Sequence, residues 1–177
     1  MEPRVTQTAD IALHESEAAH WLADFATSRV VVLGDVMLDR YVSGEVRRIS
    51  PEAPIPVLRA ADRRDVLGGA ANVAANIASL GATAVLIGLV GDDAAARQCA
   101  ALLAALPRVT ARLVRSDARP TTVKTRFMSG GHQLLRLDEE VADPLEGALE
   151  DAVLAEFAAS LPGAGAVILS DYHKGVL

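Results

Sequence analysis

Carboxylate and ammonium side chains follow two apolar runs of the sequence, residues 30–33 and 166–169. The four that we single out are Asp35, Asp39, Asp171 and Lys174. An ionised carboxylate accepts hydrogen bonds from two adjacent hydroxyl groups, and an ammonium group neutralises part of the charge of a phosphate. Ligands of open parallel sheets bind beyond the carboxyl ends of the strands. We therefore expect these side chains to meet at one sheet edge and to bind a hydroxylated, phosphorylated molecule.

Two glycines precede a helix that the sequence predicts over residues 72–80. Gly68 and Gly69 have no Cβ atom, so a ligand can approach their backbone closely. The free N–H groups at the start of the helix attract anions and polarised hydroxyl groups, and Asn72 lies in the same turn. A tight helix entry would use the same two glycines, so the pair by itself is a weak signal.

Six cationic side chains are candidates for binding a phosphate, and the sequence leaves the choice between them open. They are Arg47, Arg48, Lys124, Arg126, Arg136 and Lys174. Lys124 and Arg126 alternate with apolar or small residues and so share one face of a strand, where a solvated edge strand also uses lysine. Arg136 either reaches the substrate or pairs with Asp138, and we favour the ion pair. For Asp171, the structural alternative is a helix N-cap.

Composition excludes several other functions. The net charge of −6 and the pI near 5.2 give no basic field for nucleic acid or anionic lipid, and no apolar run is long enough to span a membrane.

Neither a dinucleotide-binding G-x-G-x-x-G after a strand nor a P-loop is present. The four histidines lack metal-ligand spacing, so we expect no metal site. The single cysteine, Cys99, lies in an apolar helical run and is expected to pack rather than react.

The elements that position these residues alternate between buried strands and helices. Buried parallel strands are predicted at 29–33, 83–90 and 166–169. Helices are predicted at about 15–25, 72–80, 93–106 and 144–160. Short alternating stretches predict a second, half-exposed sheet at 41–46, 55–59, 109–114, 121–128 and 133–137. This order predicts an α/β core with an inserted β lid.

Four segments resemble the first half of a PfkB-type, or ribokinase-like, carbohydrate kinase. They are residues 33–41 (LGDVMLDRY), 48–57 (RISPEAPIPV), 68–74 (GGAANVA) and 170–177 (SDYHKGVL). The resemblance runs from about Val30 to Leu177. Its most specific part, from Arg48 to Asn72, is similar to the members of this family that phosphorylate a heptose 7-phosphate.

The resemblance implies a ribokinase-like three-layer αβα core after a leader and helix at 1–28, with lid segments at about 40–67 and 109–138. It implies ATP-dependent phosphorylation of D-glycero-β-D-manno-heptose 7-phosphate at O1, with Mg²⁺, toward ADP-heptose for the lipopolysaccharide core. It further implies a cytoplasmic homodimer joined through the lid, with neither nucleic acid nor membrane as a partner. The alternatives are another PfkB-type sugar or nucleoside kinase, or a non-catalytic sugar-binding or dimerisation fragment.

The family pattern carries over to individual positions. By resemblance, Gly68, Gly69 and Asn72 contact the sugar and Asp39 binds its hydroxyl groups. The further substrate-binding candidates are Asp35, Lys124, Arg136, Asp171 and Lys174. The family places its Gly-Ala-Gly-Asp-like segment, with the catalytic base and most of the ATP site, after the position of Leu177. We therefore expect no catalytic base and no activity in the 177-residue chain alone.

Overall fold

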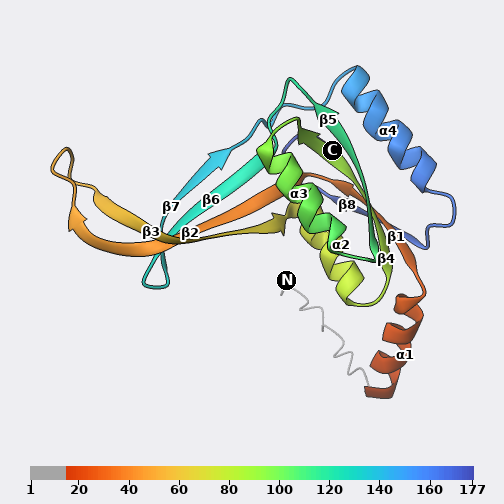
Figure 1. Ribbon diagram of the computed structural model, residues 1–177. Coiled ribbons are helices and arrows are strands. Elements are labelled where there is room, and N and C mark those ends of the chain that lie inside the picture. Colours follow the sequence, from red (N-terminus) through yellow and green to blue (C-terminus); the bar gives the residue numbers. More distant parts are fainter. Residues whose placement is uncertain (1–14) are drawn as a thin grey trace, which may run out of the picture.

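The computed structural model describes residues 15–177, and its strands form two separate sheets (Figure 1). The leader expected over residues 1–13 lies outside this range. The helices are α1 (Glu15–Ala26), α2 (Gly69–Ser79), α3 (Ala94–Ala104) and α4 (Ala148–Ser160). The strands are β1 (Arg29–Gly34), β2 (Val36–Ile49), β3 (Pro56–Gly68), β4 (Thr83–Gly91), β5 (Val109–Ser116), β6 (Thr122–Ser129), β7 (His132–Glu139) and β8 (Ala166–Ser170).

The main sheet has the order β5-β4-β1-β8, and all its strand pairs are parallel. Side chains alternate across its two faces because successive residues of a strand point in opposite directions. One face, with Val30, Val32 and Leu86, packs against α2 and α3, while the other, with Val31 and Ile87, packs against α4. The predicted α/β core with helices on both faces is confirmed.

Local signals explain how the helices begin and end. The Asp93 carboxylate accepts a hydrogen bond from the backbone N–H of Ala96 at 2.7 Å and so caps α3. Gly81, with φ 99°, follows the last turn of α2 in the left-handed conformation that glycine adopts without cost. We predicted that the last helix begins at Pro144. That is wrong, because the chain turns at Gly147 (φ 60°) and the helix starts after it.

The second sheet has the order β3-β2-β6-β7 and projects from the core as a lid (Figure 1). Its first two strands, β2 and β3, are much longer than the stretches 41–46 and 55–59 that we predicted. They form one antiparallel ribbon in which Met37 is opposite Gly68 and Ile49 is opposite Pro56. The ribbon therefore starts at the core itself. Hydrophobic alternation detected only its half-exposed outer part, because the inner residues 36–38 are all buried.

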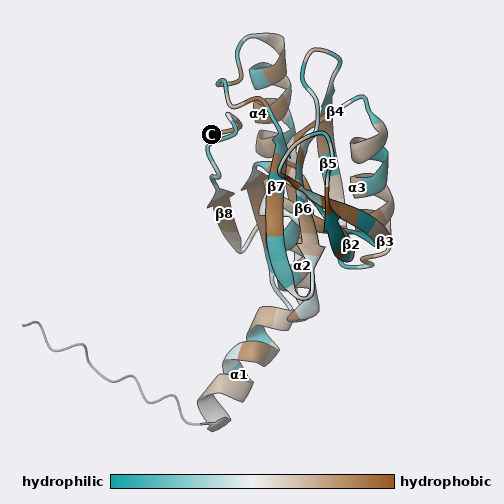
Figure 2. Cartoon of the chain, turned by 90° about the vertical axis from the view of Figure 1, so that its left-hand side faces the viewer, coloured by the Kyte–Doolittle hydropathy of each residue, from teal (hydrophilic) through white to brown (hydrophobic). Residues whose placement is uncertain are grey.

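Two strands lie in different surroundings from those expected. Residues 109–114 were expected to join the small sheet, but β5 pairs with β4 in parallel, because α3 crosses over from β4 and returns the chain to the main sheet. The last strand was expected to be buried. Instead β8 is at the sheet edge (Figure 2), with Val167 44% and Leu169 61% exposed.

Within residues 15–177, none of the helices combines the length and the apolar composition that crossing a membrane requires.

Candidate functional site

The Asp39 carboxylate lies against the backbone of Gly68, at the point where the lid joins the core. A Cβ atom at position 68 would come within 2.5 Å of Oδ2 of Asp39 and 2.8 Å of Cγ of Met37. Arg126 of β6 donates a hydrogen bond to Oδ1 of Asp39 at 2.5 Å. Asp39 belongs to β2 and not to a loop, so the strand fixes the direction of its side chain. The Asp39 carboxylate thus occupies the space that a side chain at position 68 would need.

Strand register places several charged residues of the lid on one face. Asp39 is opposite Lys124, which is opposite Asp138. In the next row Tyr41 is opposite Arg126, whose guanidinium lies 5.4 Å from the centre of the tyrosine ring. Hydrogen bonding to Asp39 outweighs burial and raises the pKa of Arg126. This face is therefore a polar surface with fixed charges, as the alternation of Lys124 and Arg126 predicted.

Glu140, immediately after β7, joins the lid to the core. Its Oε2 accepts a hydrogen bond from Nζ of Lys124 at 2.9 Å, and its Oε1 accepts one from Nζ of Lys174 at 2.8 Å. Lys124 also donates to Asp138 at 3.0 Å. The hydrogen bond from Lys174, and then that from Lys124, lowers the pKa of Glu140. Burial lowers the pKa of Lys124, but its bonds to Glu140 and Asp138 outweigh that effect and raise it.

Asp35 is 1% exposed, and its carboxylate binds the segment after β8. It accepts hydrogen bonds from the backbone N–H groups of Tyr172 (2.8 Å), Lys174 (3.1 Å) and Val176 (3.2 Å). The residues between these donors, His173 and Gly175, have φ values of 57° and 86°. Such alternation forms a concave group of N–H donors that binds an anion. Here the anion is the protein's own carboxylate, so Asp35 holds the loop that carries Lys174.

The remaining candidates lie around this junction. Gly69 has φ 55°, and a Cβ there would clash with the carbonyl oxygen of Asp35, which accepts a hydrogen bond from the N–H of Ala70 at 2.9 Å. Asn72 is exposed in the first turns of α2. Asp171 is exposed and accepts the N–H of His173 at 2.7 Å, the local turn that aspartate often makes. The structure therefore brings the sequence motifs of Asp35, Gly69 and Lys174 together.

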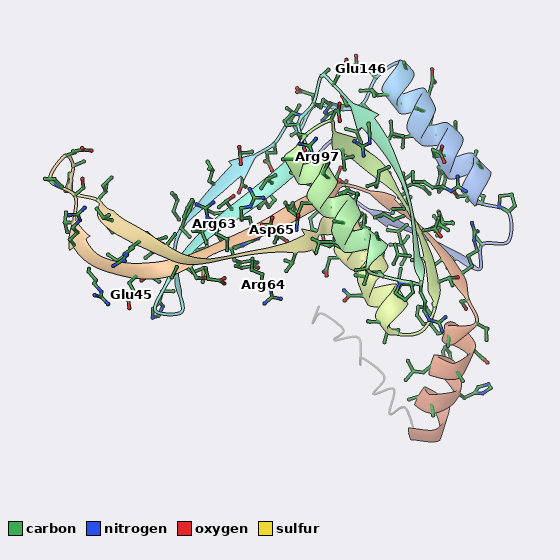
Figure 3. The ribbon with its side chains drawn as sticks, in the orientation of Figure 1. Glu45, Arg63, Arg64, Asp65, Arg97 and Glu146 are labelled. Atoms are coloured by element: carbon green, nitrogen blue, oxygen red, sulfur yellow. The ribbon has the colours of Figure 1, made fainter. Side chains whose placement is uncertain are left out.

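Other candidate cations are engaged elsewhere. Arg136 donates to both oxygens of Asp138, at 2.8 and 2.9 Å, which is the ion pair that we favoured from the sequence. Arg47 pairs with Glu45, which Figure 3 shows on the outer part of the lid, far from the main sheet. Arg48 follows it in β2 and is exposed. The structure thus separates the outer arginines from the junction at which Lys124 and Lys174 meet.

The outer part of the same lid face is hollowed. An open cavity of about 450 Å³ begins at Tyr41 and Arg64 and extends to the hairpin at Gly130. It continues the surface that starts at Asp39, because Tyr41 is the next residue of β2 on that face. A ligand held by Asp39 can therefore extend outward along the lid.

Metal ligands are not gathered in this part of the chain. Among residues 15–177, no group of three or more histidine, cysteine, aspartate or glutamate residues is placed to hold a metal ion. Cys99 is buried, and burial raises the pKa of its thiol to about 12.

Sequence reasoning missed Glu140 and Arg119. Arg119 donates to the carbonyl oxygens of Val141 (2.9 Å) and Lys174 (3.2 Å), so it fixes the same junction from the loop before β6. The acidic run at 138–140 directly after an alternating strand was the available signal for Glu140. No local pattern distinguishes Arg119 from the other arginines.

Comparison with known proteins gives consistent results. The sequence profile described as pfkB family carbohydrate kinase matches residues 27–168. The bifunctional protein HldE of Azorhizobium caulinodans is 52% identical over 157 residues, which are 88% of this chain and 33% of that protein. HldE of Caulobacter vibrioides is 52% identical over 159 residues, or 90% of this chain and 32% of that protein. The chain thus spans about a third of the length of these relatives.

Solved structures share the fold. Phosphofructokinase-2 from Escherichia coli in complex with potassium superposes with a TM-score of 0.63 at 22% identity, covering 85% of this chain and 47% of that one. The microbiome-derived acarbose kinase Mak1 superposes with a TM-score of 0.62 at 17% identity, covering 81% of this chain and 45% of that one. These likenesses establish a ribokinase-like fold for the described residues and confirm the predicted fold class.

Proposed function

The chain belongs to the PfkB family of carbohydrate kinases, and we propose that it is the sugar-binding part of a kinase for D-glycero-β-D-manno-heptose 7-phosphate. The proposed reaction transfers the γ-phosphoryl group of ATP to the O1 hydroxyl and yields the 1,7-bisphosphate. The identity of about 50% to HldE proteins over most of the chain supports this assignment over other members of the family.

One observation carries the proposal: the Asp39 carboxylate lies against Gly68 on the lid face that also holds Lys124. Asp39 accepts hydrogen bonds from sugar hydroxyl groups, and the missing Cβ at Gly68 leaves the space that the Asp39 carboxylate occupies. A hydroxylated ring and a phosphate need these two kinds of group, a carboxylate and nearby cations. Both are present at the junction of lid and core.

The residues of this chain bind and orient the substrate in the proposed reaction. Asp39 holds the hydroxyl groups of the sugar. Gly69 and Asn72, at the start of α2, contact the sugar. Lys124 and Lys174 bind the phosphate of the substrate. We assign Asp35 to holding the loop of Lys174, since its carboxylate is buried and already accepts three backbone N–H groups. Arg136 and Asp171 contribute to the polar surface around the substrate.

ATP and Mg²⁺ enter the proposal through the family alone. ATP supplies the phosphoryl group. The described residues contain no cluster that would hold the metal, and we assign no step of the reaction to it. By the same resemblance, the base that deprotonates O1 is expected outside this chain, so the 177 residues alone should show no turnover.

The test uses the protein expressed from the complete gene. Purified protein is incubated with ATP and one acceptor in each of four parallel reactions, and ADP release is measured. The acceptors are heptose 7-phosphate, fructose 6-phosphate, ribose and adenosine. The expected result is the highest kcat/KM for heptose 7-phosphate, with a new anomeric phosphate in the ³¹P spectrum of the product. A higher kcat/KM for one of the other compounds would assign the protein to another PfkB-type activity. Binding of heptose 7-phosphate without turnover would favour a non-catalytic role.

We also propose that two copies associate through the opposite face of the lid. That face carries Phe127, Leu135 and Leu137, of which the two leucines are 60% and 48% exposed. A cavity of about 350 Å³ is lined there by Ile55, Pro56, Leu58, Phe127, Leu134 and Leu135. Burial of this apolar surface between two copies would stabilise a dimer. Light scattering should show a dimer that Leu135→Lys converts to a monomer, and a wild-type monomer would contradict the proposal.

A further inference from the structure

The two lysines of the chain converge on one carboxylate. The sequence has fifteen arginines and only two lysines, Lys124 and Lys174. Lys124 is on the lid and Lys174 is in the core loop, yet each donates to a different oxygen of Glu140, at 2.9 and 2.8 Å. Their side chains are 13% and 17% exposed, and that of Glu140 is 24% exposed. Both ammonium groups are therefore held in a partly closed site.

The lysines keep hydrogen-bonding capacity after these contacts. An ammonium group has three donors. Lys124 uses two of them, on Asp138 and Glu140, and Lys174 uses one, on Glu140. One donor remains on Lys124 and two remain on Lys174. These three free donors equal in number the three terminal oxygens of a phosphate monoester. The cluster has the donors that such a phosphate needs.

We propose that Glu140 is a positioning residue that holds Lys124 and Lys174 together as one binding site for the substrate phosphate. Without the carboxylate, two ammonium groups would repel each other, and the lid lysine would not be tied to the core loop. Glu140 itself does not bind the phosphate, whose negative charge it would repel. This inference rests on the proposed function, because it names the groups that bind the phosphate of that substrate.

Variants of Glu140 separate positioning from simple charge balance. Glu140→Asp keeps the charge but shortens the side chain, so its two carboxylate oxygens can no longer contact both lysines at the same time. Glu140→Gln keeps the length but replaces one acceptor by a donor. In the protein from the complete gene, we expect both variants to raise the KM for heptose 7-phosphate about tenfold, the loss of roughly one hydrogen bond to a charged group. The kcat and the KM for ATP should change less than about twofold.

Glu139→Asp is the matched control. Glu139 is the neighbouring residue on β7 and is opposite Val123, so its side chain points to the other face of the lid. The Glu139→Asp variant should keep the wild-type KM for the sugar phosphate. A wild-type KM in Glu140→Asp would mean that only the charge is needed and would overturn the proposal. A lower KM in Glu140→Gln would show that Glu140 competes with the phosphate, and would also overturn it.

A second measurement does not depend on turnover. Lysine residues of the wild-type protein are acetylated with and without inorganic phosphate, and the modified positions are identified by mass spectrometry. We expect phosphate to protect Lys124 and Lys174 together, and the protection to disappear in Glu140→Asp. Absence of joint protection in the wild type would refute the lysine pair as a phosphate site. If heptose 7-phosphate is not a substrate but protection is found, the proposed function fails while the phosphate site stands.

Discussion

The backbone N–H of Lys174 donates a hydrogen bond to the Asp35 carboxylate across a sequence separation of 139 residues. This contact ties the first strand of the core to the segment after its last one. Asp35 links the motif at 33–41 to the motif at 170–177, which the pairing of β1 with β8 places side by side.

Asp35→Ala is expected to destabilise the protein. It removes a buried acceptor and leaves the N–H groups of Tyr172, Lys174 and Val176 without their partner. Loss of hydrogen bonds to a charged group should lower the free energy of unfolding by about 3 kcal/mol or more. Urea denaturation of the wild type and the variant measures this. Asp117→Ala, at an exposed position, serves as the control, and an unchanged midpoint in Asp35→Ala would contradict the role of the carboxylate.

Asp39→Ala tests the hydroxyl contact. Because a hydrogen-bonded carboxylate contributes about 1.5–3 kcal/mol, the KM for the sugar phosphate should rise by roughly ten- to a hundredfold. The KM for ATP should not change. Initial rates at varied concentrations of each substrate separate the two effects. If the KM for the sugar phosphate stayed at its wild-type value, Asp39 would not belong to the site.

Gly68→Ala tests the close approach of Asp39 to the backbone. Gly68 has an extended backbone (φ −120°, ψ 172°) that alanine also adopts, so the substitution acts through its Cβ and not through strain. The Cβ would displace the Asp39 carboxylate and Met37. We expect a folded protein with a strongly raised KM for the sugar phosphate. Gly165→Ala is the matched control, since its Cβ would meet only the carbonyl oxygen of Arg29, at 3.7 Å.

The thiol of Cys99 should be unreactive in the native protein. Burial, and then the charges of Asp93 and Asp65, raises its pKa from 9.0 to about 12. The nucleophilic thiolate is therefore absent near pH 8. Because the folded pKa is the higher one, this thiol reduces stability only as the pH rises above about 9. A thiol reagent at pH 8 should label Cys99 only after denaturant is added, and rapid labelling of the native protein would show that the site opens.

The sequence predicted the core better than the lid, for a physical reason. Apolar runs such as 30–33 are buried on both faces of the main sheet, and this burial requires the residue types that reveal them. The lid is half exposed, so most of β3 carries charged residues that could equally form a loop, while the inner part of β2 is buried and lacks the alternation of a half-exposed strand. The position of β5 could not be read from its residues, because its sheet is determined by the crossover through α3.

In the candidate site, short motifs identified the residues but not their partners. Asp39, Lys124 and Lys174 were nominated from their types and places in the chain. The function of Asp35 as a loop anchor depends on N–H groups of residues 172–176, and backbone donors carry no sequence signal. Glu140 was missed because its role arises only when β7 ends beside the loop after β8.

The parallel pairing of β2 with β6 also determines when the lid can form. Met37 is opposite Thr122, and β3, α2, β4, α3 and β5 all lie between them in the chain. During synthesis, β2 and β3 can form their hairpin early, but its open edge must wait for the core unit that delivers β6. Such long-range pairing is slow. We therefore expect the nascent hairpin to be a target for chaperones, and substitutions in α3 to delay completion of the lid.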